Sequence, residues 1–135
     1  MEVRSRQQSS KGPTRMFTGD VWIDALVGDG DYQRMRVSLV RFSPGARTAW
    51  HSHPRGQTLY IVEGRGLVQS RGGQVVEVRA GDVVHTPPGE EHWHGAAPDR
   101  FMAHIAMWEV DDAGTGAIWG PHVTDVEYHG QAPAG

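Results

Sequence analysis

Two histidines at alternate positions lie in the sequence Gly45-Ala46-Arg47-Thr48-Ala49-Trp50-His51-Ser52-His53-Pro54-Arg55-Gly56-Gln57. In a β-strand the side chains at positions i and i+2 lie on the same face, so His51 and His53 can direct both imidazoles to one point. Beyond a short link that contains proline and glycine, the chain can turn back and bring the amide oxygen of Gln57 to that point. His92 and His94 repeat the alternate spacing farther along the chain. The two pairs together predict a cluster of imidazoles carried by β-strands.

Glycine and proline recur at short intervals from Gly19 to Pro98, and no long amphipathic helical period separates them. Short apolar runs bounded by such turn signals are typical of an all-β sandwich or barrel. Paired glycines in Arg71-Gly72-Gly73 favour a tight hairpin, and Pro87-Pro88-Gly89 must be a turn because proline cannot donate within a central ladder. The expected strands are Val21–Leu26, Met35–Phe42, Thr48–His51, Leu59–Glu63, Gly66–Ser70, Val75–Val78, Val83–Thr86, His92–Gly95 and Met102–Val110.

The composition indicates one domain, because 135 residues suit a single core. The formal net charge of −3 lacks the basic excess that binding to a nucleic-acid backbone or an anionic membrane requires. No apolar run is long enough for a membrane-spanning helix, and the first residues lack an apolar secretory core, so a cytoplasmic location is expected. The chain has no cysteine, which excludes disulfides, thiolate metal ligands and a thiol nucleophile.

The polar ends of the chain differ from its centre. Residues 1–14 are predicted to be a flexible arm, residues 15–129 a single barrel domain and residues 130–135 a flexible tail. Thr124 is a candidate N-cap for a short helical turn that ends at Tyr128. Nine strands in one domain need their edges closed or stacked, and a small barrel does this.

The residues around both histidine pairs resemble the two motifs of the cupin superfamily. The first motif is matched by Gly45, His51, His53, Gln57 and Gly64, and the second by Gly81, Pro87-Pro88-Gly89 and His92. The resemblance implies a single-domain cupin, which is a small double-stranded β-helix or jelly-roll barrel with little helix. It also implies one metal ion inside the barrel, on the residues that match His51, His53, position 57 and His92.

Two positions depart from the cupin pattern. Gln57 stands where cupins usually carry Glu, and Ala96 stands where the second motif often ends in Asn. Three neutral imidazoles and a neutral amide leave the full 2+ charge on a bound ion, which then polarises a bound oxygen more strongly. The missing carboxylate also separates this site from the two-histidine facial triad of ferrous oxygenases.

The set of three histidines and a glutamine, followed by His94, resembles the bacterial cupin hydroxynitrile lyases. The strings Pro44–His51, Gly56–Leu59, Phe17–Gly19 and Ala103–Ala106 are also similar to theirs. The resemblance implies one manganese ion on His51, His53, Gln57 and His92. Nitrogen and oxygen ligands also permit Fe, Ni, Co and Zn. The resemblance also implies an acid/base role for His94, with Thr48 and His104 in the same pocket. These lyases reversibly join cyanide to aldehydes to give (R)-cyanohydrins, so the expected partner is a small molecule.

Other functions fit the same motifs. A cupin dioxygenase or an isomerase acting on a small carbonyl or enol substrate is one alternative, although such cupins usually keep the glutamate that is missing at position 57. A non-catalytic module that binds a metal or a ligand is another. Cupins are commonly dimers, so a homodimer or higher homo-oligomer is expected.

Several residues have a second interpretation that is purely structural. His94 and His104 can be packed core histidines, and Thr48 a simple β-branched strand residue. Trp50 and Trp93 have the opposite strand parity to the ligand histidines, so they are expected to face away from the metal. Arg47 is expected to be an exposed strand residue or a cation at the pocket mouth, and His85 a bystander at the rim.

Overall fold

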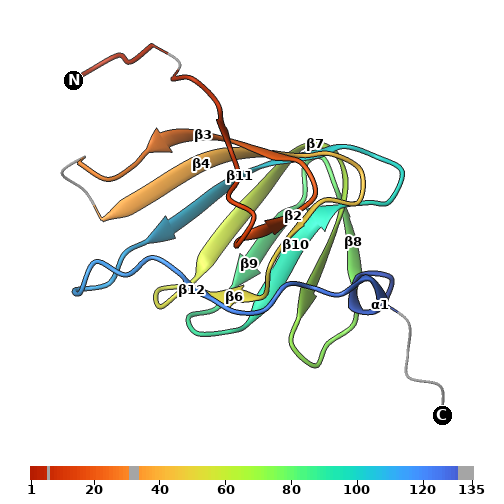
Figure 1. Ribbon diagram of the computed structural model, residues 1–135. Helices are drawn as coiled ribbons and strands as arrows, with labels where there is room; N and C mark the ends of the chain where they lie inside the picture. Colours follow the sequence, from red (N-terminus) through yellow and green to blue (C-terminus); the bar gives the residue numbers. More distant parts are fainter. Residues whose placement is uncertain (6, 31–33, 131–135) are drawn as a thin grey trace.

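One long strand, β7 (Gln57–Ser70), takes part in both layers of the structure (Figure 1). In the computed structural model, which describes residues 1–5, 7–30 and 34–130, its first half pairs with β11 (Met102–Glu109) and β9 (Val83–Thr86). Its second half pairs with β10 (His92–Ala96) and β8 (Val76–Arg79). These pairings curl the sheet into an open barrel whose two layers share β7.

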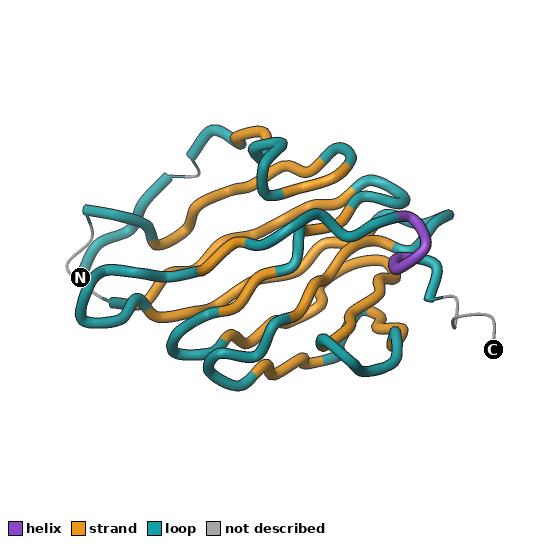
Figure 2. The backbone as a smooth tube through the Cα atoms, turned by 60° about the horizontal axis from the view of Figure 1, so that its bottom comes forward, coloured by secondary structure: helices purple, strands orange, loops and turns teal. Residues whose placement is uncertain are grey.

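The remaining elements extend the two layers. They are β1 (Ser10–Lys11), β2 (Phe17–Thr18), β3 (Val21–Val27), β4 (Met35–Phe42), β5 (Arg47–Thr48), β6 (His51–Ser52), β12 (Ile118–Trp119) and the helix α1 (Asp125–Tyr128). The strand order is β1-β3-β4-β11-β7-β10-β5-β2, and β6 lies between β10 and β12. Strands dominate the chain trace, and α1 is the one helix among the described residues (Figure 2). The predicted all-β barrel is therefore confirmed.

The predicted strand Thr48–His51 is two short strands rather than one. β5 pairs with β2 and β10, whereas β6 pairs with β10 and β12. Between them the backbone N–H of Trp50 donates to the carbonyl of Pro121 at 2.9 Å. The ladder is interrupted because the C-terminal segment supplies this bond, and local sequence gives no sign of it.

The predicted strands Leu59–Glu63 and Gly66–Ser70 are parts of the single strand β7. Gly64 has a φ of 77°, a conformation that glycine adopts without steric strain. The pairing between β7 and β11 shifts register at Ala103, which marks a β-bulge beside this glycine. The chain bends there without leaving the sheet.

The barrel interior is apolar except around the histidines. Residues at alternate positions of β4, β7 and β11 point inward and form the main core, among them Val40, Phe42, Leu59, Ile61 and Met102. Alternation along each strand explains the set, since every second side chain lies on the inner face. Each of these residues is at most 6% exposed, so apolar burial stabilises the layers that carry the site.

A second apolar cluster lies outside the barrel. Trp50 and Trp93 face away from the ligand histidines, as predicted, and they pack with Val123 and Tyr128 of the C-terminal segment. Arg47, predicted to be exposed or at the pocket mouth, is instead 5% exposed. The prediction was wrong because the C-terminal segment covers this side chain, a long-range contact that strand parity does not reveal.

The ends of the described chain are partly structured. Ser10 and Lys11, within the predicted arm, pair with β3, and Ser9 donates a hydrogen bond to Asp24. Thr124 caps α1 as predicted, because its hydroxyl accepts from the backbone N–H of Glu127. Of the predicted tail, residues 131–135 lie outside the described residues. Nowhere in the described chain is there a helix with the length and apolar character needed to cross a membrane.

Candidate metal centre

Three histidines from neighbouring strands lie together inside the barrel. His51 in β6 pairs directly with His92 in β10, and their ring centroids are 4.3 Å apart. His53 follows β6 by one residue, and its ring centroid lies 5.0 Å from that of His51. One nitrogen from each ring lies within 4.8 Å of the other two, and all three side chains are buried. This cluster and its imidazole chemistry indicate a site for a divalent metal ion.

Backbone carbonyls determine which nitrogen of each of the three rings carries the proton. The Nδ1 atoms of His51, His53 and His92 lie 2.9, 2.8 and 3.0 Å from the carbonyl oxygens of Ala49, Gly116 and Glu90. A carbonyl oxygen can only accept a hydrogen bond, so each neutral ring carries its proton on Nδ1. Each Nε2 then presents a lone pair, which is the form in which histidine binds a metal.

Gln57 contributes an oxygen to the same point. Its Oε1 lies 3.1 Å from Nε2 of His92, and Nε2 of His53 is buried without a hydrogen-bond partner. Because His92 carries its proton on Nδ1, its Nε2 and the Oε1 of Gln57 both present lone pairs, and these two atoms lie 3.1 Å apart. A cation bound to both atoms stabilises this arrangement. Ligands about 2.1 Å from one ion lie about 3 Å apart when they are adjacent, so these residues fit a bound divalent ion.

The turn before Gln57 depends on a glycine. Gly56 has a φ of 81°, and a Cβ built on it would lie 2.9 Å from the carbonyl oxygen of Thr86. Its backbone N–H donates to the carbonyl of His53 at 3.0 Å, which closes the turn. The chain therefore reverses at once, and Gln57 begins β7 beside the histidines.

Burial keeps the cluster neutral. Desolvation lowers the pKa of His51 well below 6.5, with a further contribution from His92 and His53, and it lowers the pKa of His53 to about 4. The pKa of His92 is lowered by the same cause. All three imidazoles are unprotonated at neutral pH, as metal binding requires.

His94 and His104 form a second buried pair next to the cluster. Nε2 of His104 lies 2.9 Å from Nδ1 of His94, and the His94 ring centroid lies 5.2 Å from that of His51. Nε2 of His94 has no hydrogen-bond partner among the described residues. Desolvation, followed by the charge of His104, lowers the pKa of His94 well below 6.5. Two neutral, coupled imidazoles thus lie beside the candidate metal ligands.

Thr48 connects this pair to β5. Its hydroxyl oxygen accepts a hydrogen bond from the backbone N–H of His94 at 3.2 Å, and the side chain is 1% exposed. The hydroxyl hydrogen stays available as a donor. The structure therefore brings Thr48, His94 and His104 together, whereas His85 is exposed on β9, where its Nδ1 lies 3.3 Å from the hydroxyl oxygen of Thr58.

These residues surround a pocket of about 150 Å³. Thr48, His51, His53, Gln57, His94 and His104 form its polar wall. Apolar side chains form the rest of its lining, among them Met16, Phe17, Ile23, Trp108 and Trp119. A small pocket with a polar wall and an otherwise apolar lining is suited to a ligand that has a single polar centre and an apolar substituent.

Sequence reasoning missed Gly116 and Trp119. Gly116 supplies the acceptor for Nδ1 of His53, and the indole of Trp119 stacks on the ring of His51 with 4.5 Å between centroids and 24° between planes. Both residues follow the motif region and lie more than 60 positions from their partners. No spacing pattern in the sequence indicates them.

The comparison with known proteins agrees with this geometry. The chain is 49% identical over 130 residues to an (R)-mandelonitrile lyase of Granulicella tundricola. The aligned region covers 95% of this chain and 98% of that protein. A cupin-like protein of Thermotoga maritima has a solved structure with a TM-score of 0.84, 42% identity and 96% coverage of both chains. The polyketide cyclase RemF of Streptomyces resistomycificus shares the fold at a TM-score of 0.72 and 19% identity, covering 96% of this chain and 91% of its own.

The family model described as "Cupin domain" matches residues 38–108, a span that begins within β4, ends within β11 and includes every residue of the polar wall. Together with the barrel topology and the buried histidine cluster, this match shows that the chain belongs to the cupin family.

Proposed function

We propose that this protein is a metal-dependent hydroxynitrile lyase, which cleaves aryl cyanohydrins such as (R)-mandelonitrile to an aldehyde and hydrogen cyanide and catalyses the reverse addition. The observation that carries the proposal is that the buried pair of His94 and His104 lines the same pocket as His51 and His53. A proton carrier and a metal site then act on one substrate. The relative of Granulicella tundricola, named as an (R)-mandelonitrile lyase, supports this reaction over other cupin chemistries.

His51, His53, Gln57 and His92 are the proposed ligands, and manganese is the proposed ion. Their support is the convergence of three Nε2 lone pairs and one amide oxygen. A divalent ion held there supplies a Lewis acid that stabilises negative charge on the substrate oxygen.

His94 is the proposed proton carrier. When its Nδ1 donates to Nε2 of His104, its own Nε2 presents a lone pair to the pocket. In the cleavage direction Nε2 accepts the hydroxyl proton of the cyanohydrin, the bond between the carbinol carbon and the cyanide carbon breaks, and the oxygen becomes the aldehyde carbonyl. The departing cyanide takes the proton from His94. The products are the aldehyde and hydrogen cyanide, and the imidazole returns to its neutral form.

The pocket walls orient the substrate for this step. The hydroxyl of Thr48 donates to the substrate oxygen, while Phe17 and Trp108 contact the aryl group. A pocket of about 150 Å³ has room for one substituted benzene ring.

The proposal is tested by adding (R)-mandelonitrile to the manganese-loaded protein and following benzaldehyde by absorbance, from mildly acidic to neutral pH. We expect cleavage above the spontaneous rate, and (R)-mandelonitrile as the product of the reverse reaction by chiral chromatography. His94→Gln is expected to lower kcat about 100-fold or more, because it removes the proton carrier. His85→Gln, a matched change at an exposed histidine, is expected to leave kcat unchanged. Aldehyde release no faster than the spontaneous reaction would show that this is not the function.

We also propose a homodimer and a cytoplasmic location. Tyr60, Val62 and Val83 support the dimer, since these exposed apolar side chains lie together on the outer face of β7 and β9. Light scattering coupled to size-exclusion chromatography is expected to give twice the mass of one chain. A measured mass equal to that of one chain would contradict the dimer.

A further inference from the structure

The segment Gly116–Trp119 crosses the barrel next to the candidate ligands, although it lies beyond the residues matched to the cupin family model. Its two-residue strand β12 lies beside β6 (Figure 1). In this pairing Trp119 is opposite His51 and Ile118 is opposite Ser52. Among the described residues, β6 has β12 on one side and β10 on the other. The strand that carries His51 is thus held between the second motif and this later segment.

Gly116 reaches His53 through its backbone. Its carbonyl oxygen lies 2.8 Å from Nδ1 of His53. A Cβ built on Gly116 would lie 2.8 Å from Nε1 of Trp108, which is closer than real Cβ atoms approach. The absence of a side chain therefore lets the backbone of Gly116 lie close to the indole of Trp108 while its carbonyl contacts the imidazole of His53.

Trp119 contacts His51 through its ring. The two rings are stacked with 4.5 Å between centroids, and the indole also contacts the ring of Phe17, with 6.2 Å between centroids. Nδ1 of His51 donates a hydrogen bond to the carbonyl of Ala49, so the His51 ring can still tilt about the axis of that hydrogen bond. The stacked indole limits this tilt and closes one side of the pocket.

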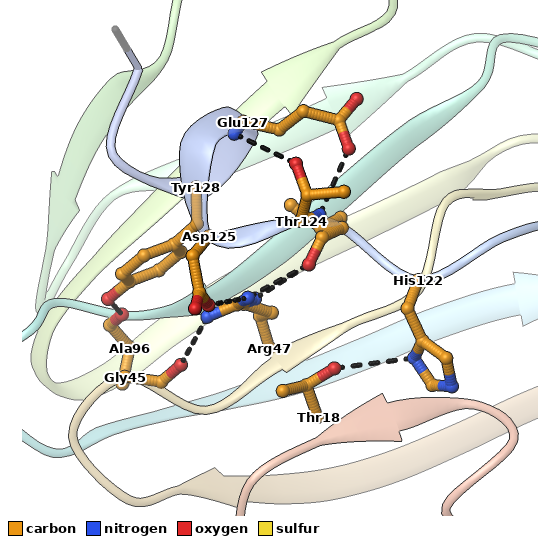
Figure 3. A network of polar contacts seen from close by, with 10 residues as sticks. Thr18, Gly45, Arg47, Ala96, His122, Thr124, Asp125, Glu127 and Tyr128 are labelled. Atoms are coloured by element: carbon orange, nitrogen blue, oxygen red, sulfur yellow. Dashed lines mark hydrogen bonds and ion pairs between the residues drawn. The ribbon is translucent and has the colours of Figure 1, made fainter.

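The segment is anchored at both ends. Before it, the carboxylate of Asp111 accepts from the backbone N–H groups of Ala113 and Thr115. After it, the guanidinium of Arg47 donates to the carbonyl of Val123 at 2.8 Å and to the carboxylate of Asp125 at 2.8 Å. Figure 3 shows Arg47 between Asp125 and the carbonyl of Gly45. Such anchors give the segment a defined position without the support of a metal.

We infer that Gly116–Trp119 is a positioning segment for the metal ligands, in which the Gly116 carbonyl sets the tautomer of His53 and the Trp119 indole sets the ring plane of His51. Neither residue touches the ion in this role. The inference rests on the proposed metal site but not on the reaction catalysed there. Outer contacts that orient ligand histidines typically change metal affinity by 10- to 100-fold.

The test measures Mn²⁺ binding to the full-length protein by the electron paramagnetic resonance signal of the free ion, in the absence of substrate. Trp119→Ala is expected to weaken Mn²⁺ binding by about 10-fold or more, and Trp119→Phe, which keeps a stacking ring, to restore most of the affinity. Ile118→Ala is the matched control, because this side chain is on the same strand but 60% exposed. Its affinity is expected to equal that of the wild type.

Thermal unfolding of the metal-free proteins separates positioning from folding. A Trp119→Ala protein that unfolds at the wild-type temperature yet binds Mn²⁺ more weakly supports the inference. If Trp119→Ala is less stable than the wild type, the comparison with Trp119→Phe decides between the two roles. A Trp119→Phe protein that regains Mn²⁺ affinity while its unfolding temperature stays low supports positioning. If Mn²⁺ affinity rises and falls only with the unfolding temperature across the variants, the inference is overturned. Wild-type affinity in Trp119→Ala also overturns it, as does a wild-type protein that binds no Mn²⁺. A failed mandelonitrile assay with weakened Mn²⁺ binding in Trp119→Ala would reject the proposed reaction and leave this inference intact.

Discussion

Single side chains determine the charge of the candidate metal centre. Gln57 provides an oxygen where a carboxylate would add a negative charge, and its Oε1 lies 3.1 Å from Nε2 of His92. The three histidines are held neutral by burial. The four candidate donors are therefore uncharged, and a divalent ion bound to them would keep its full positive charge for polarising a substrate.

Gln57→Glu is expected to bind Mn²⁺ about 10-fold more tightly and to lower kcat for mandelonitrile about 10-fold, because the carboxylate neutralises part of the ion's charge. Free Mn²⁺ by electron paramagnetic resonance and initial rates measure the two effects. Gln69→Glu is the control, because it adds the same charge on the same strand, β7. Gln69 accepts a hydrogen bond from the indole of Trp93, outside the barrel and away from the candidate ligands. Unchanged kcat in Gln57→Glu would argue against a role for the neutral amide.

At the scale of elements, the close approach of β5 and β10 aligns Thr48 with His94. Gly95 lies opposite Arg47, and a Cβ on Gly95 would lie 2.5 Å from the carbonyl oxygen of Ala46 and from Cβ of Arg47. The backbones can meet only because position 95 has no side chain. This contact places the hydroxyl of Thr48 on the backbone N–H of His94.

Gly95→Ala is expected to lower the free energy of unfolding by about 2–3 kcal/mol, because the contacts that a methyl group would meet are backbone and Cβ atoms that cannot rotate away. Urea unfolding measures this loss. Gly28→Ala, where a Cβ would meet nothing within 4 Å, is expected to change stability by less than about 0.5 kcal/mol. Equal stability of the two variants would mean that β5 and β10 can separate without loss.

At the scale of the whole molecule, folding buries a group of neutral imidazoles within one barrel. Desolvation lowers the pKa of His53 and of His104 to about 4, whereas a histidine in the unfolded chain has a pKa of about 6.5. Between these values the unfolded chain binds more protons than the folded one. Stability is therefore complete above pH 6.5 and is lost as the pH falls toward 4.

The metal-free protein is accordingly expected to lose free energy of unfolding from pH 6.5 to pH 4, with His104 contributing up to about 3 kcal/mol. Urea unfolding at several pH values measures the slope. His104→Phe is expected to flatten it by up to about 1.4 kcal/mol per pH unit, whatever its own stability. Met102→Leu, a change in a buried side chain that does not titrate, should keep the wild-type slope. An unchanged slope in His104→Phe would mean that His104 titrates normally in the folded state.

The sequence predicted the fold class and the neighbourhood of the histidines because both depend on local patterns. Alternation assigned His51 and His53 to one face and His92 and His94 to one face, with Trp50 on the opposite side of its strand, and these histidines are buried while Trp50 packs in the second cluster. The strands Met35–Phe42 and Val83–Thr86 were predicted with their observed bounds. The roles of the site residues stay predictions until metal binding and catalysis are measured.

By itself the sequence determined an all-β barrel, since strand parity and turn residues act over a few positions, and the resemblance of its two histidine motifs to those of cupins implied which histidines lie inside that barrel. Only the tertiary structure decided the burial of Arg47, the division of the strand at Trp50 and the contacts of Gly116 and Trp119 with the histidines. These depend on the C-terminal segment folding back over β5 and β6. The partners lie more than 60 positions apart, a separation over which periodicity and spacing carry no information.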